Sequence, residues 1–255
     1  MSGQNSKSQN HQDHLPNMPA IKYLAAKAAQ QLDKELMSTG GFSIDQLMEL
    51  AGLSVAAAVM KLQPKEKGKR ILVVAGPGNN GGDGLVASRH LWHFGYEPTV
   101  FYPKPTKGDL YERLCVQLHE LKIPFVDDMY PAIDNTDHIV DAIFGFSFSG
   151  EIREPFPNII SALKSTKTPV LSVDAPSSWT IDNGPPTSGP GEGFMPNALI
   201  SLTAPKPCVE WFQGRHFLGG RFVPPGIVEK FGLVLPEYPG AEQVVEITGE
   251  KMEKL

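Results

Sequence analysis

A glycine-rich segment carries the clearest chemical signal in this sequence. Residues 76–84 read Gly-Pro-Gly-Asn-Asn-Gly-Gly-Asp-Gly and directly follow an unbroken apolar run at residues 71–75. Glycines let the backbone approach an anion closely, and the N–H groups at the start of a helix favour negative charge. Gly76, Gly78 and Gly81 also satisfy the G-x-G-x-x-G spacing of dinucleotide-binding turns. The segment therefore predicts a nucleotide or anion site between a strand and a helix.

This spacing does not by itself define the ligand. An ordinary NAD-binding unit places an acidic residue at the end of its second strand, about 20 residues further on, to hold the ribose hydroxyls. Here that strand ends Phe-Tyr-Pro-Lys at residues 101–104, without a carboxylate. The turn also carries Asn79, Asn80 and Asp83, which a simple pyrophosphate turn does not need. An oxidoreductase that uses NAD is therefore disfavoured, and a nucleotide or anion site of another kind is favoured over a turn without a ligand.

Two further apolar runs end in side chains that bear oxygen. Asp141 lies within the run at residues 138–144, and Asp174 follows the run at residues 170–173. Taken singly, each carboxylate could simply cap a turn. The loop at residues 145–151 alternates aromatic and small polar residues, which suits a flat ring, although its phenylalanines could equally belong to the core. Because parallel strands end at one edge of a sheet, where ligands bind, we expect these segments to form one site.

The sequence offers few other catalytic patterns. Its histidines are scattered, and Cys115 and Cys208 are its only cysteines, so neither a transition-metal site nor a disulfide framework is indicated. It has no G-x-S-x-G segment of the kind that carries the nucleophile of α/β-hydrolases. The Asn, Asp and Ser oxygens at the strand ends suit a hard cation instead.

The elements that must position these residues alternate between helices and strands. We expect helices at residues 21–37, 44–62, 82–94, 109–121 and 159–164, and strands at 71–75, 99–102, 124–126, 138–144, 170–173, 198–202 and 221–223. Ser43 and Gln46 predict a capping box for the second helix. The fold class is α/β, a Rossmann-like three-layer sandwich with a mostly parallel central sheet and helices on both faces. The first two helices have no strand partner, and either pack across the sheet or form part of a dimer contact.

Bulk composition limits the class of protein. The chain has 255 residues, of which 41% are hydrophobic and 20% charged, and residues 21–255 suit one large α/β domain. Its net charge of −5 argues against nucleic acid as a main partner. No segment approaches the about 20 apolar residues of a membrane span. Residues 1–20 are polar, with one Lys and no Arg, and we expect a disordered tail and not a targeting signal. The expected compartment is the cytoplasm, with a mitochondrial pool left open.

Together these segments resemble the NAD(P)H-hydrate epimerase family, also called the YjeF N-terminal domain family. The resemblance rests on residues 76–84, on Asp-Ala-Ile-Phe-Gly-Phe at 141–146 and on Val-Asp-Ala-Pro-Ser at 173–177. Segments at 45–52 and 218–224 support it, so that it covers about residues 21 to 231. It implies an isomerase that interconverts the R and S forms of hydrated NADH and NADPH, a step of metabolite repair. It also implies a homodimer that acts with a separate ATP-dependent dehydratase, because no such domain follows within this sequence.

The same resemblance implies the site residues. Substrate contacts are expected from Asn79, Asn80, Gly81, Gly82, Asp83, Gly145, Phe146, Ser147, Phe148, Ser149, Gly150, Glu151 and Asp174. One potassium ion per chain is expected to bind Asn80, Asp141 and Ser177. Asp174 is the candidate acid/base group, because a carboxylate at a strand end can be held within reach of a ligand. Where the family usually reads Asp-Ile-Pro-Ser-Gly, this chain has Ala175 and Ser178, and Ser178 is expected to tighten the turn.

A non-catalytic role is the main alternative. The same fold occurs in scaffolds of RNA decay, and one family member is known as an apolipoprotein-binding protein. A scaffold that binds a nucleotide, RNA or a protein could lose Asp174, Asn79 or Asn80 without penalty. All three residues are present in this chain, which favours an enzyme.

Overall fold

The centre of the protein is an eight-stranded sheet in the order β4-β3-β2-β5-β6-β7-β8-β9. The computed structural model describes residues 20–250 and 252–254, so the predicted tail lies outside the described residues except for Ala20. All neighbouring strands of the large sheet are parallel except β8 and β9. The strands are β2 (Arg70–Ala75), β3 (Glu97–Phe101), β4 (Phe125–Val126), β5 (His138–Ala142), β6 (Val170–Val173), β7 (Ala198–Leu202), β8 (Arg215–Gly219) and β9 (Val244–Glu246). A separate parallel pair joins β1 (Ile21–Tyr23) to β10 (Met252–Lys254).

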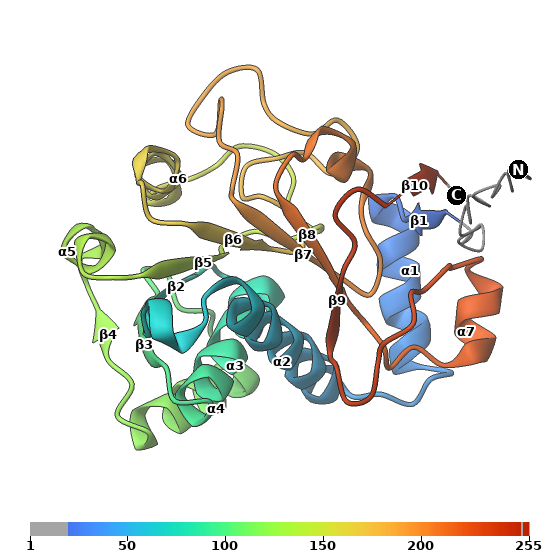
Figure 1. The fold of residues 1–255 in the computed structure, drawn as a ribbon, viewed down its shortest axis with the longest axis horizontal. Coiled ribbons are helices and arrows are strands. Elements are labelled where there is room, and N and C mark those ends of the chain that lie inside the picture. Colours follow the sequence, from blue (N-terminus) through green and yellow to red (C-terminus); the bar gives the residue numbers. More distant parts are fainter. Residues whose placement is uncertain (1–19, 251, 255) are drawn as a thin grey trace, which may run out of the picture.

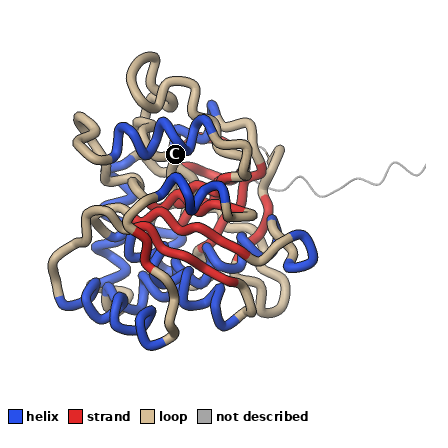
Figure 2. The backbone as a smooth tube through the Cα atoms, turned by 90° about the vertical axis from the view of Figure 1, so that its left-hand side faces the viewer, coloured by secondary structure: helices blue, strands red, loops and turns tan. Residues whose placement is uncertain are grey.

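Helices cover both faces of the large sheet (Figures 1 and 2). One face carries α2 (Ile44–Leu62), α3 (Asn79–His93) and α4 (Asp109–Glu120), and the other carries α5 (Met129–Asp134) and α6 (Phe156–Ser165). Side chains alternate along the strands, so that Val73 and Val140 pack in the first core while Leu72 and Ile139 pack in the second. The predicted three-layer α/β fold is confirmed.

Two more helices lie beside the sheet, and α1 (Ala26–Met37) packs against α7 (Pro225–Lys230). Two short 3₁₀ helices, η1 (Lys65–Lys67) and η2 (Pro207–Trp211), complete the elements. The expectation that the N-terminal helices pack across the sheet is confirmed for α2, because α2 contacts α3 and also reaches β7, β8 and β9. Its predicted capping box is present, with Ser43 Oγ accepting from Gln46 N at 3.2 Å and Gln46 Oε1 accepting from Ser43 N at 2.8 Å.

Several predicted elements differ from the structure, among them the helix expected at 159–164, which begins at Phe156, and the strand expected at 138–144, which ends at Ala142. The expected strand at residues 221–223 is wrong, since these residues follow β8 in a turn, and the strand itself begins at Arg215. The expected helix at 21–37 divides into β1 and α1, because its first residues pair with β10. The helix after the glycine-rich turn begins three residues earlier than expected, at Asn79, since Gly78 already caps it.

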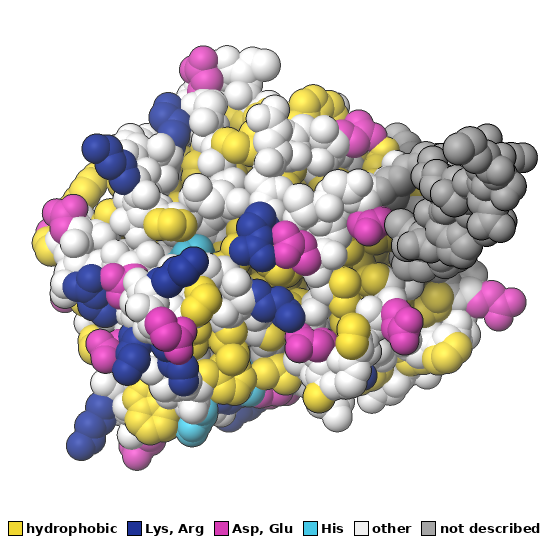
Figure 3. Space-filling model, viewed as in Figure 1, with side chains coloured by type: hydrophobic (Ala, Val, Ile, Leu, Met, Phe, Trp, Pro, Cys, Tyr) yellow, Lys and Arg dark blue, Asp and Glu magenta, His cyan; other side chains and the backbone are white. Residues whose placement is uncertain are grey.

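The surface carries charges of both signs. On the face in Figure 3, basic and acidic side chains are interspersed among polar and apolar ones. None of the helices in the described part of the chain is long and apolar enough to cross a membrane.

Candidate active site

Three neighbouring strands bring the predicted site segments together. β2, β5 and β6 are adjacent and parallel, so the segments that follow them leave the same edge of the sheet. The order of the chain reverses between β2 and β5, because β3 and β4 lie on one side of β2 and β6 lies on the other side of β5. Open α/β sheets bind ligands in the crevice at such a switch point. The expectation that these strand ends share one edge is confirmed.

The turn between β2 and α3 leaves no room for a side chain at two of its glycines. A Cβ atom on Gly76 would lie 2.0 Å from the carbonyl oxygen of Ile143, and one on Gly81 would lie 1.9 Å from the carbonyl oxygen of Gly76. Gly78 has a φ of 145° and caps α3 without a side-chain hydrogen bond. Since the first N–H groups of a helix have no partner within it, they remain available to an anion in this turn.

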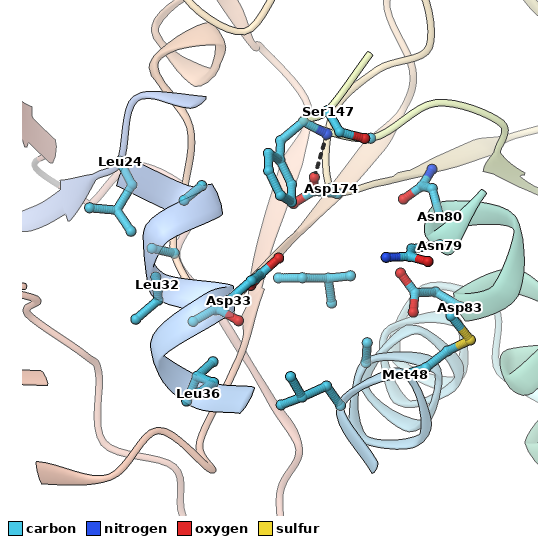
Figure 4. A pocket seen from close by; sticks show the side chains of 18 of the residues that line it. Leu24, Leu32, Asp33, Leu36, Met48, Asn79, Asn80, Asp83, Ser147 and Asp174 are labelled. Carbon is cyan, nitrogen blue, oxygen red and sulfur yellow. Dashed lines mark hydrogen bonds between the residues drawn. The ribbon is translucent and has the colours of Figure 1, made fainter. Parts of the chain in front are cut away.

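A cavity of about 180 Å³ lies between α1, α2 and α3 at this edge (Figure 4). The predicted residues that line it are Asn79, Asn80, Asp83, Gly145, Phe146, Ser147 and Asp174. An adjoining cavity of about 260 Å³ shares several of these residues and adds Phe148 and Ser149. Four other predicted contacts line neither cavity: Gly81 and Gly82 are buried in the start of α3, while Gly150 and Glu151 are exposed.

Asp174 is held in place from two sides. Lys206 forms a salt bridge with its Oδ1 atom, and the backbone N–H of Phe146 donates to its Oδ2 atom at 2.7 Å. Lys206 Nζ also donates to the carbonyl oxygen of Leu202 at 2.8 Å. Both charged side chains are almost completely buried, at 5% exposure for Asp174 and 3% for Lys206. A carboxylate fixed in this way cannot turn away from the cavity without breaking a buried ion pair.

Gly145 lies between the side chains of Asn80 and Asp174. A Cβ atom at this position would lie 3.0 Å from Asn80 Oδ1 and 3.0 Å from Asp174 Oδ2. Both contacts are tighter than ordinary van der Waals distances, so any larger residue would displace an oxygen. The absence of a side chain here therefore lets α3 and the end of β6 contribute to one site.

Two further carboxyl groups face the first cavity. Figure 4 shows Asp33 on α1 and Asp83 on α3 at opposite sides of it, with Asp174 between them at the sheet edge. Burial raises the pKa of Asp83 well above its usual value, and the charges of Asp174 and Asp33 add to this effect. Burial likewise raises the pKa of Asp33 to about 6, with Lys206 opposing the rise and Asp174 adding to it. The cavity therefore gathers three carboxyl groups around one ammonium group.

Two of the predicted potassium ligands, Asp141 and Ser177, form a buried polar cluster, while the half-buried Asn80 lines the cavity. Asp141 is fully buried and accepts hydrogen bonds from Ser177 Oγ at 2.5 Å, Ser177 N at 3.0 Å and Ser172 Oγ at 2.7 Å. Burial raises its pKa, and hydrogen bonds from Ser177 and Ser172 oppose the rise. No Lys or Arg side chain among the described residues pairs with it, and the buried Asn80 Nδ2 atom has no hydrogen-bond partner. A buried carboxylate that lacks a cationic partner, hydrogen-bonded only to hydroxyl and backbone groups, fits a hard cation bound by oxygen atoms.

Ser178 occupies a strained position in the turn that carries Asp174. Its φ is 89°, in the region that favours glycine, and its buried hydroxyl has no hydrogen-bond partner among the residues that the structure describes. That hydroxyl fills the space where a side chain of Gly191 would lie, with Oγ 1.8 Å from an added Cβ atom. The residue is therefore accommodated opposite a glycine and does not displace Asp174 or Ser177.

Sequence reasoning missed Asp33 and Lys206. Asp33 shares a helix face with Ala29, Leu32 and Leu36, all buried, so a carboxylate that interrupts an apolar stripe was the available signal. Lys206 lies in the segment after β7, as Asp174 lies in the segment after β6, and the two strands are neighbours. Polar residues that follow neighbouring parallel strands share one edge of the sheet, and applying this rule to β7 as well would have identified Lys206.

The fold and the cavity define a doubly wound α/β protein with a nucleotide-type turn at the switch point of its sheet. The chain belongs to the family described as YjeF-related protein N-terminus, whose model matches residues 44–208. A Fusarium vanettenii protein named NAD(P)H-hydrate epimerase is 69% identical to it over 235 residues, covering 91% of this chain and 100% of that protein. A Schizosaccharomyces pombe protein of the same name is 55% identical over 238 residues, covering 91% and 98%. The crystal structure of the yeast protein ynu0 (YNL200c) matches with a TM-score of 0.81 and 43% identity, covering 90% of this chain and 100% of that chain.

Proposed function

We propose that this chain interconverts the R and S forms of hydrated NADH and NADPH. The observation that carries the proposal is the position of Asp174, fixed by Lys206 in a cavity that begins at the glycine turn of α3. Relatives named NAD(P)H-hydrate epimerase, at identities up to 69%, support the same activity. In this proposal the N-terminal turn of α3 holds the phosphates, and the cavity between α1 and α3 holds the hydrated ring.

The chemistry requires a proton carrier beside the reacting carbon. The substrate bears a hydroxyl on C6 of its reduced nicotinamide ring, next to the ring nitrogen. The nitrogen lone pair assists the loss of hydroxide, and water then returns from the other face; opening and reclosing the ring is the other route. Both routes need an acid/base group, and Asp174 supplies one because its carboxylate is fixed in the cavity. Lys206 positions that carboxylate.

We also propose one potassium ion bound by oxygens of Asn80, Asp141 and Ser177. Its charge would balance the buried Asp141 carboxylate and fix the loops that follow β2, β5 and β6. Replacing Asn80 or Ser177 by Ala should weaken the dependence of the rate on potassium, measured by titration against sodium. An unchanged potassium dependence in both variants would contradict the assignment.

Assembly and location complete the proposal. We propose a homodimer in the cytoplasm that acts with a separate ATP-dependent dehydratase. Cys115 and Cys208 are both free, which suits a reducing compartment. Light scattering on the purified protein tests the dimer, and coupling to purified dehydratase tests whether both hydrates are then consumed.

The proposed activity is tested with separated S and R hydrates of NADPH. The protein should interconvert them, as followed by chromatography, without a redox change at the ring. The Asp174→Asn variant should lose about 10²- to 10⁴-fold in rate, the usual contribution of a general acid or base. Asp134→Asn, an exposed position on α5, is the matched control and should keep full activity. Full activity of Asp174→Asn would refute its role, and an inactive wild-type protein would favour the scaffold alternative.

A further inference from the structure

Asp33 lies on the wall of the cavity formed by α1, and among the described residues it has no ion-pair partner of its own. Its neighbours along the buried face of α1 are apolar, and none of the described residues forms a hydrogen bond or an ion pair with its carboxyl group. Glu35, two residues further on, is instead paired with Lys230 of α7 at 2.8 Å. A half-buried carboxyl group without a partner is unfavourable for folding. Its position therefore calls for a role in the cavity.

The surroundings of Asp33 keep its carboxyl group able to hold a proton. The charged groups that face it from other elements are Asp83 on α3, Asp174 after β6 and Lys206 after β7. α2 presents only apolar side chains to the cavity, among them Leu47 and Met48. Burial in this setting raises the pKa of Asp33 to about 6. A carboxyl group in an apolar cavity beside an ionised one is a known arrangement for a proton donor and acceptor pair.

The proposed reaction needs two such groups, so this inference rests on the proposed function. Epimerisation at C6 removes the hydroxyl from one face of the ring and adds water to the other. A carboxyl group that approaches from one wall reaches only one face of a bound ring. Asp33 and Asp174 approach the cavity from different elements, α1 and the end of β6 (Figure 4).

We propose that Asp33 is the second acid/base group of the site and serves the ring face turned toward α1. As the C6–O bond breaks, its electron pair leaves with the oxygen, and the Asp33 carboxyl proton converts that hydroxyl to water. The lone pair of the ring nitrogen forms the C6=N bond. Water then adds to C6 from the other face and gives a proton to Asp174, while the C6=N electrons return to nitrogen. Proton exchange with solvent restores both groups, and the reverse reaction interchanges their roles.

The test compares Asp33→Asn, Asp33→Glu and the control Glu35→Gln, which alters the same helix outside the cavity. Asp33→Asn should lower kcat by about 10²-fold or more, as expected for loss of a general acid, with KM changed by less than about threefold. Asp33→Glu should recover part of that loss, and Glu35→Gln should match the wild type. The wild-type pH profile should show a limb near the Asp33 pKa of about 6 that is absent from the Asp33→Asn profile.

Two results would overturn the inference. The first is an Asp33→Asn variant with the kcat of the wild type. The second is an Asp33→Asn variant whose pH profile keeps the limb near pH 6 and whose KM alone rises, which would make Asp33 a binding residue. Melting curves establish that each variant is folded. Failure of the wild-type protein to interconvert the hydrates would refute the proposed function itself, whereas an active wild type with an active Asp33→Asn variant would refute only the role of Asp33.

Discussion

Replacing Asp33 by Asn should make the folded protein more stable at neutral pH. Burial raises the pKa of the Asp33 carboxyl from 3.8 to about 6. The folded state therefore holds this proton more tightly than the unfolded chain, so the contribution of Asp33 to stability is most favourable below about pH 4 and is lost as the pH rises through about 6. Above that pH the folded state contains an ionised carboxylate in a largely apolar cavity. Asparagine has nearly the same shape without the charge, so it removes this unfavourable term.

The rise in the Asp33 pKa sets the size of the expected change in the free energy of unfolding. One pKa unit corresponds to about 1.4 kcal/mol, so the rise from 3.8 to about 6 sets an upper limit of about 3 kcal/mol. Asp33 is only half-buried, and solvent screens part of the interaction. We therefore expect Asp33→Asn to raise the free energy of unfolding by about 1 to 2 kcal/mol above pH 6.

Urea unfolding of the wild type and the variant, followed by circular dichroism from about pH 4 to pH 8, measures this difference. The free energies of unfolding of the two proteins should nearly coincide at about pH 4, diverge between about pH 4 and 6, and differ by a constant amount above about pH 6. Glu35→Gln should behave in the opposite way, because Lys230 lowers the pKa of Glu35 and the wild-type carboxylate is stabilising at neutral pH. The electrostatic argument would be refuted if Asp33→Asn raised the free energy of unfolding equally at every pH, or lowered it at neutral pH.

Four other substitutions test separate parts of the structure. Gly145→Ala should lower the epimerisation rate at least about tenfold, because its Cβ atom would lie 3.0 Å from Asp174 Oδ2; steady-state kinetics checks this. Lys206→Met should lower the free energy of unfolding by about 3 to 5 kcal/mol in urea, because it leaves a buried carboxylate unpaired. His138 is buried, its ring nitrogens have no hydrogen-bond partner within the described part of the chain, and burial lowers its pKa from 6.5 to about 4. The contribution of His138 to stability should therefore fall by up to about 3 kcal/mol as the pH drops from about 6.5 to 4, and His138→Leu should remove this contribution. Ser178→Gly should stabilise the protein by about 1 kcal/mol in thermal unfolding, because it relieves a φ of 89°, and leave the rate unchanged.

The sheet-edge part of the site could be predicted because local patterns mark it. The apolar runs before Gly76, around Asp141 and before Asp174 are buried on both sides of the sheet, and such runs are visible as uninterrupted hydrophobic segments. Parallel strands end at one edge, so the chemistry of the three segments could be combined without knowing a single distance. The strand order β2-β5-β6 then places them as neighbours.

The α1 wall of the cavity could not be predicted in the same way. The position of Asp33 depends on contacts between distant parts of the chain, including the packing of α1 on α7. No local pattern encodes such contacts. β8 was misplaced for a related reason, since it begins with Arg215 and His216, whose polar side chains conceal a strand that is recognisable only by its pairing with β7.

The pairing of β1 with β10 has a consequence for how the protein is made. Ile21 pairs with Met252, and β1 lies directly before the helix that carries Asp33. On the ribosome, α1 emerges early and residues 252–254 emerge more than two hundred residues later. A nascent chain that has reached only β9 already contains Asp174 and Lys206, yet lacks the strand that anchors the start of α1. The wall with Asp33 is therefore the last part of the cavity to be secured during synthesis.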